Sequence, residues 1–155
     1  MPGCVSSSVE NAGGCRRRAN IAANKSFGTP GPFDLQVHVA DFVLAGRHVR
    51  AFDVQPDGSL TNDRVFIDMR GDAEGVPDGM KVDVEGNVYC TGPGGVWILD
   101  PAGNHLGNIL TGADQTTNCC WGGDDWKTLF ITTRETVGRI QMKIAGIPVP
   151  RGPIA

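Results

Sequence analysis

The chain has 155 residues, 22 glycines, 10 prolines and a formal net charge of −3. This length suits one domain with a sizeable core. The glycine and proline content disfavours a helical protein and favours a turn-rich all-β protein. The acidic balance argues against a nucleic-acid-binding protein, which normally presents a basic face, and no apolar stretch is long enough for a membrane span.

The five cysteines do not form the pattern of a disulfide framework. Their number is odd, and Cys119 and Cys120 are adjacent in the sequence. No Cys-x-x-Cys pair is present, so a structural zinc site is not expected. Reduced, buried thiols and the lack of a signal-peptide pattern together predict a cytoplasmic location.

In chain order, residues 1–34 come first, and they are rich in Gly, Ser, Ala, Asn and Arg without apolar alternation. We expect an unstructured or non-native lead-in there. Residues 35–150 consist of short β-type runs separated by turns, and residues 151–155 are expected to be a tail. Ten strands are predicted: Leu35–Ala40, Arg47–Val54, Arg64–Asp68, Met80–Val84, Asn87–Thr91, Val96–Asp100, His105–Leu110, Asn118–Trp121, Thr128–Thr132 and Val137–Lys143.

Pairs of these runs repeat along the chain. One strand pair begins at residue 86 and a similar pair begins at residue 127, 41 residues later; a poorer copy covers residues 36–53. A period of about 40–50 residues with four strands per unit is typical of β-propeller blades. The sequence therefore predicts an all-β partial propeller of about three four-stranded blades.

Asp78 is the most informative single residue. It lies in a Pro-Asp-Gly turn before a predicted strand, where a carboxylate can bind a divalent cation or act as a general base. The local pattern alone favours an ordinary turn residue, because Asp-Gly is a common turn dipeptide. Asn118 follows 40 residues later, so the blade period gives both residues equivalent places facing a central channel.

Other catalytic patterns are poorly supported. No serine lies in Gly-x-Ser-x-Gly, no His-Glu-x-x-His spacing occurs, and His38, His48 and His105 are expected to be structural. Residues 83–87 resemble a calcium loop only faintly, because the final glutamate is missing. Trp97, Trp121 and Trp126 are expected to pack between blades. Metal-assisted hydrolysis remains as the chemical hypothesis.

A set of motifs, in order and at matching spacing, resembles the C-terminal half of the SMP-30/gluconolactonase/LRE-like family over about residues 35–150. The motifs are Val49–Val54, Asp57–Leu60, Pro77–Asp83, Gly86–Tyr89, Gly95–Trp97, Asn118–Gly123 and Ile144–Pro150.

The resemblance implies a six-bladed propeller of roughly twice this length that hydrolyses sugar lactones such as gluconolactone. It implies one divalent cation in the channel: calcium or zinc, or else magnesium or manganese. At the family's Pro-Asp-Gly motif, Asp78 would be a metal ligand and the general base. Asn118 would line the substrate or support the channel wall.

The chain also departs from the family pattern. The family's glutamate ligand lies in a first blade that has no counterpart here, as does the asparagine that contacts substrate. Another asparagine ligand would fall near Asn24, although residues 24–31 do not match the family motif. We therefore expect a truncated, weakly active or inactive lactonase that self-associates through open propeller edges. The alternative is a non-catalytic propeller-type binding or scaffold protein.

Overall fold

The structure, a computed structural model, describes residues 21–25, 35–41 and 46–148. Its eleven strands form three antiparallel sheets, each following the chain order. The first sheet holds β1 (Ile21–Lys25), β2 (Leu35–Asp41), β3 (His48–Val54) and β4 (Leu60–Asp68). The middle sheet holds β5 (Met80–Val82), β6 (Val88–Gly92), β7 (Gly95–Leu99) and β8 (His105–Leu110). The third sheet holds β9 (Thr116–Gly122), β10 (Thr128–Thr133) and β11 (Val137–Gln141).

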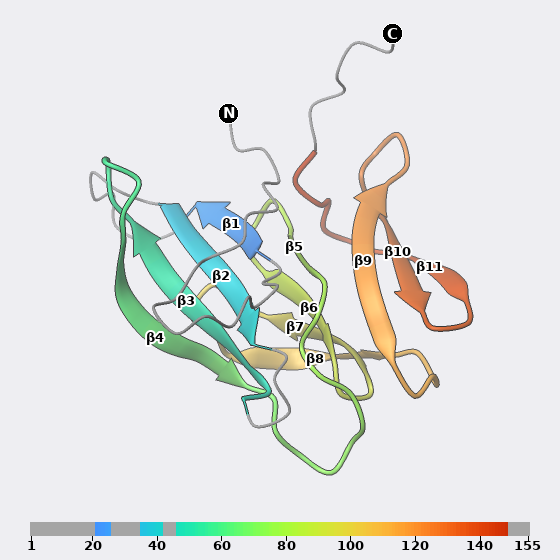
Figure 1. The fold of residues 1–155 in the computed structure, drawn as a ribbon. Coiled ribbons are helices and arrows are strands. Elements are labelled where there is room, and N and C mark those ends of the chain that lie inside the picture. Colours follow the sequence, from blue (N-terminus) through green and yellow to red (C-terminus); the bar gives the residue numbers. More distant parts are fainter. Residues whose placement is uncertain (1–20, 26–34, 42–45, 149–155) are drawn as a thin grey trace, which may run out of the picture.

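The three sheets lie side by side in chain order (Figure 1), from the first sheet in blue to green, through the middle sheet in yellow-green, to the third in orange. Their opening strands are neighbours, since β5 contacts both β1 and β9. Sheets that radiate from adjacent first strands are successive propeller blades. The predicted all-β partial propeller is therefore confirmed, although the third sheet has three strands, not four, among the described residues.

Each of the ten predicted strands overlaps one of the strands β2 to β11. The additional strand, β1, lies inside the expected lead-in and pairs antiparallel with β2, with Asn24 opposite Gln36. Its sequence, Ile-Ala-Ala-Asn-Lys, has no apolar alternation, so only the neighbouring strand indicates its conformation. Residues 1–20, 26–34 and 149–155, which include the predicted tail, lie outside the described residues, so these boundaries stay predictions.

Two hydrophobic cores join the sheets. The first lies between the first and middle sheets, and the second lies between the middle and third sheets. The first core contains Ala40, Val49, Met69, Met80, Val82, Val88, Cys90 and Leu99. The second contains Tyr89, Val96, Cys119, Trp121, Leu129 and Ile131. The middle sheet is thus covered on both faces, and every residue of β6 is buried.

The predicted packing role of the tryptophans is confirmed. Trp121 belongs to the second core, Trp126 packs against it, and Trp97 packs against the first core. The expectation of buried, reduced thiols holds for Cys90 and Cys119 but is wrong for Cys120, which is free and exposed because it faces away from the second core. Cys4 and Cys15 lie outside the described residues.

Two hairpin turns share the pattern Asp-x-x-Gly-Asn. Asp83 is fully buried and accepts hydrogen bonds from the backbone of Glu85 and Asn87, the Asn87 amide and the Tyr89 hydroxyl. Asp100 makes the equivalent bonds to Ala102 and Asn104 nearer the surface. The faint calcium-loop pattern at residues 83–87 is therefore a turn whose carboxylate binds protein donors.

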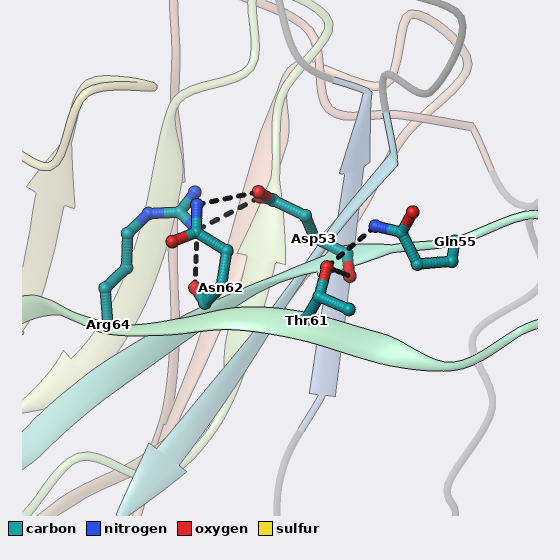
Figure 2. A network of polar contacts seen from close by, with 5 residues as sticks. All are labelled: Asp53, Gln55, Thr61, Asn62 and Arg64. Atoms are coloured by element: carbon teal, nitrogen blue, oxygen red, sulfur yellow. Dashed lines mark hydrogen bonds and ion pairs between the residues drawn. The ribbon is translucent and has the colours of Figure 1, made fainter.

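The β3–β4 hairpin carries a polar network (Figure 2). Asp53 accepts hydrogen bonds from Asn62 at 2.8 Å and from Arg64 at 3.0 Å, and Gln55 donates to Thr61 at 2.7 Å. The bond from Asn62, together with Arg64, lowers the pKa of Asp53 below its usual 3.8.

Among the described residues, no helix is long and apolar enough to cross a membrane.

Candidate active site at the start of β5

Asp78 lies in the turn that enters β5, and backbone hydrogen bonds fix this turn on two strands. The Asp78 N–H donates to the Thr91 carbonyl at 3.0 Å, and the Thr91 N–H donates to the Gly79 carbonyl at 2.9 Å. The Gly79 N–H donates to the Thr117 carbonyl of β9 at 3.1 Å. The half-buried Asp78 is therefore held where the middle and third sheets meet.

Gly79 allows the close approach of β9. A Cβ atom at Gly79 would lie 2.2 Å from the Asn118 Oδ1 atom and 2.7 Å from the Asn118 Cα atom. Such contacts are too short for any real side chain, so this position requires glycine for space. The sequence-predicted residues Asp78 and Asn118 are consequently brought together, through Gly79.

Thr91 is a site residue that sequence reasoning missed. Its side chain is fully buried, and its Oγ1 accepts a hydrogen bond from the Gly79 N–H at 2.9 Å. The same hydroxyl lies 3.2 Å from the Thr117 carbonyl and 3.3 Å from the Gly79 carbonyl, to which it can donate. A threonine inside a fully buried strand was the available signal, because buried hydroxyls need partners.

The structure corrects the equivalence of Asp78 and Asn118. On β5, Met80 pairs with Cys90 and faces the first core, which lies on the preceding sheet. On β9, Cys119 pairs with Ile131 and faces the second core, which again lies on the preceding sheet. Met80 and Cys119 therefore occupy equivalent positions in their sheets. By this register Asn118 corresponds to Gly79, one residue from the predicted match. The cause is a difference in hairpin length. The β9–β10 hairpin has two more residues between its core-facing pair, Trp121 and Leu129, than the β5–β6 hairpin has between its pair, Val82 and Val88.

The thiols near this turn are not reactive groups. Cys90 and Cys119 are buried, and burial raises the pKa of both thiols, that of Cys119 to about 12. Lys81, whose ammonium donates to the Met80 carbonyl at 2.9 Å, partly opposes this effect at Cys119. Both thiols stay protonated near neutral pH, so neither is a nucleophile or a thiolate ligand.

Asn24, the third sequence-predicted site residue, lies on β1, the first strand of the first sheet. Because β1 contacts β5, the backbone at Asn24 belongs to the same group of inner strands as the Asp78 turn. Its side chain lies outside the described part of the structure, so its role as a ligand stays a prediction.

The donor set suits a hard divalent cation in kind but not in number. Asp78 and Asn118 offer carboxylate and amide oxygens, which calcium prefers, but calcium takes about six to eight oxygen ligands. The Asn118 Oδ1 atom already accepts a hydrogen bond from the Cys119 N–H at 2.8 Å. Across residues 21–25, 35–41 and 46–148, no three His, Cys, Asp or Glu side chains gather into a metal-binding group.

Sheets that radiate from adjacent inner strands, with polar side chains where those strands begin, define part of a β-propeller with a candidate site at the start of its inner strands. The chain belongs to the SMP-30/Gluconolactonase/LRE-like family, whose profile matches residues 41–135.

Individual relatives agree with this family. The gluconolactonase of Zymomonas mobilis is 30% identical over 121 residues, which cover 74% of this chain and 34% of that protein. A solved structure assigned as a gluconolactonase matches with a TM-score of 0.69 and 24% identity, over 84% of this chain and 41% of the other. The calcium-binding protein regucalcin from Agrobacterium tumefaciens matches with a TM-score of 0.65 and 22% identity, over 84% and 48%. The chain thus spans about a third to a half of the length of these proteins.

Proposed function

We propose that this chain carries part of the active site of a sugar-lactone hydrolase. The observation that carries the proposal is the pairing of the half-buried Asp78 turn with Asn118 at the meeting of two inner strands. Membership of a family that includes gluconolactonases supports lactone substrates, and the small, polar donor groups suit a sugar ring. The reaction would take place in the cytoplasm.

In the proposed mechanism, the Asp78 carboxylate takes a proton from water as the water oxygen attacks the lactone carbonyl carbon. The ring C–O bond then breaks, and the leaving ring oxygen receives a proton to give the free hydroxy acid. Asn118 hydrogen-bonds the sugar and keeps the carbonyl in line with the water. A divalent cation at this site, calcium or zinc in the first place, would supply polarisation of the carbonyl.

The donor set of one copy is short of cation ligands, so we propose that the isolated chain is weakly active or inactive. This can be measured by following acid release from gluconolactone by metal-depleted protein, with and without added calcium or zinc. We expect slow, metal-dependent turnover that falls by about 100-fold or more in Asp78→Asn, in line with the loss of a general base.

The matched control is Asp63→Asn, an exposed carboxylate on β4 that pairs with Arg50 on the first sheet. This variant should keep the activity of the unmodified chain. Fast turnover that survives Asp78→Asn would contradict the proposal, provided that circular dichroism shows the variant to be folded.

The alternative is a propeller-type binding or scaffold protein without catalysis, which the incomplete donor set favours. It predicts no stoichiometric binding of calcium or zinc. Calorimetric titration of the metal-depleted chain with calcium or zinc separates the two functions. One-to-one metal binding that is lost in Asp78→Asn excludes a scaffold protein without a metal site.

A further inference from the structure

The backbone of β5 shows which of its groups point toward the axis of the propeller. β5 is the first strand of the middle sheet, so it pairs with β6 on one edge only. The Asp83 N–H bonds to the Asn87 carbonyl on the β6 side, whereas the Val82 carbonyl accepts from the Ile147 N–H on the opposite edge. Alternate residues of an antiparallel strand share an edge, so the Met80 carbonyl points the same way as that of Val82. This edge lies between β1 and β9, the inner strands that surround a propeller channel (Figure 1).

Lys81 places its ammonium at this channel edge. Its Nζ atom donates to the Met80 carbonyl at 2.9 Å, so the charge lies where that carbonyl points. The same charge partly opposes the rise that burial causes in the pKa of the Cys119 thiol, so it also lies close to β9. Cys119 directly follows Asn118 on that strand. Lys81 is therefore a cationic group of the wall that carries the Asp78 turn.

The Lys81 ammonium has no acidic partner among the described residues. The ion pairs of that part of the chain all lie on the first sheet or directly after it. The next carboxylate on the same face of β5 is Asp83, which already accepts hydrogen bonds from Glu85, Asn87 and Tyr89. Lys81 is half-buried, and charges removed from water are normally paired with an opposite charge. An ammonium that bonds to a neutral carbonyl is thus available to an anionic ligand.

The spacing along β5 determines which end of a ligand meets Lys81. Asp78 and Met80 are two residues apart in the sequence, which corresponds to about 7 Å of extended chain. Asn118 lies between them, since a Cβ at Gly79 would be 2.2 Å from its Oδ1 atom. A lactone whose carbonyl carbon is attacked at Asp78 therefore directs the remote end of its sugar toward the Lys81 ammonium.

We propose that Lys81 is a specificity-determining residue, which selects sugar lactones with a second, anionic group at the end remote from the lactone carbonyl. The group is a carboxylate or a phosphate. The inference rests on the proposed function, which supplies the lactone and its direction along β5. An ammonium has three N–H donors, and Met80 uses one, so two remain for the anionic oxygens. Ring opening leaves the remote group unchanged, so the acid product is held by the same contact.

Three sugar acids that differ only at the remote end test the proposal by NMR titration. Gluconate ends in a hydroxymethyl group, glucarate ends in a carboxylate, and gluconate phosphorylated at its terminal hydroxyl ends in a phosphate. At least one of the two doubly charged acids should bind about tenfold more tightly than gluconate, as expected for one charge-assisted hydrogen bond. The tighter of the two identifies the remote group. Equal affinities for all three acids, or binding of none, overturn the proposal.

Variants of Lys81 test whether its ammonium causes the preference. Lys81→Met removes the charge and keeps a side chain of similar length, so the three acids should bind equally. Lys81→Gln should give the same loss, so a folding defect in one variant does not decide the test, and Lys81→Arg should keep the preference. The matched control is Lys143→Met, because Lys143 is exposed beyond β11 and its loss should change nothing. A preference that survives in folded Lys81→Met or Lys81→Gln overturns the proposal.

Asp78→Asn separates this inference from the proposed function. The variant should lose turnover of gluconolactone and keep the preference for a charged remote end, because the Lys81 contact is unchanged. A preference that depends on Lys81 in a chain without any turnover supports the anion contact and overturns the proposed function. Turnover that depends on Asp78 in a chain with equal affinities for the three acids overturns the role of Lys81 alone.

Discussion

Asp78 acquires its neighbours through the residue that follows it. Gly79 has no side chain, and its backbone bonds to Thr117 and Thr91 hold the carboxylate-bearing turn against Asn118. The local geometry of the candidate site therefore depends as much on a missing side chain as on the polar groups present.

Gly79→Ala should destabilise the protein by about 1–3 kcal/mol, because a methyl group there would meet the Asn118 Oδ1 and Cα atoms. Gly138→Ala on β11 is the control, since a Cβ at Gly138 meets nothing within 4 Å. Urea denaturation measures both variants. Equal stabilities for the two would show that β9 can move away from Gly79 without cost.

The stability of the fold should depend on pH through Asp53, and the hydrogen bonds that its carboxylate accepts give the sign of this dependence. Because the folded-state pKa lies below the usual 3.8, its stabilising effect is complete above pH 3.8 and is lost as the pH falls through the lowered value. Asp53→Asn should therefore reduce the melting temperature at pH 7, and the difference from the unmodified chain should shrink as the pH falls through the lowered pKa of Asp53.

The bond from Asn62 can be removed without backbone strain. Asn62 has a φ of 53°, in the left-handed region that glycine adopts freely, so Asn62→Gly deletes the amide and keeps the backbone conformation of β4. The pKa of Asp53, measured by NMR titration of its carboxyl carbon, should rise in this variant. A constant value would mean that Arg64 alone sets it.

At the scale of single elements, the two Asp-x-x-Gly-Asn turns show one local structure in two environments. Asp83 is completely buried and also accepts from the Tyr89 hydroxyl, and burial together with this carboxylate raises the pKa of Tyr89. Asp100 makes the same backbone bonds where solvent can replace them.

Asp83→Ala should cost more than about 3 kcal/mol, because several buried donors lose their acceptor and each unsatisfied group costs about 1–3 kcal/mol. Asp100→Ala should cost about 1 kcal/mol, as is typical of bonds that water can replace. Thermal unfolding of the two single variants gives the comparison. Similar losses of stability at both positions would show that burial does not strengthen the contribution of the aspartate's hydrogen bonds.

The elements also show what sequence could predict. Alternating apolar residues between turn signals placed β2 to β11, because that pattern reflects burial of alternate side chains. β1 was missed because its partner strand, not its own residues, determines it. The repeat period brought Asp78 and Asn118 together, but the longer hairpin of the third sheet shifted the register by one residue. The role of Thr91 depends on contacts 12 and 26 residues away, which no local pattern encodes.

At the scale of the whole molecule, the two cores share the middle sheet. Leu99 in the first core and Leu129 in the second are both fully buried, and residues of β6 contribute to both cores. Loss of either core therefore leaves the middle sheet with one face exposed to water.

Leu99→Ala and Leu129→Ala should each cost about 2–5 kcal/mol, as for other buried leucines. Both should keep one cooperative transition, because neither outer sheet has a core independent of the middle sheet. Calorimetry and circular dichroism should give coincident curves. Two separate transitions in either variant would mean that the cores unfold independently.

The central position of the middle sheet also has a consequence during synthesis on the ribosome. All residues of the first core precede residue 100, so this core can close while β9 and β10 are still to be made. Until they emerge, the face bearing Tyr89 and Val96 lacks the side chains of β9 and β10 that pack on it. Nascent chains whose last residue to leave the ribosome lies between 100 and 115 should therefore be the ones that bind chaperones most strongly, since exposed apolar surface is what such factors recognise.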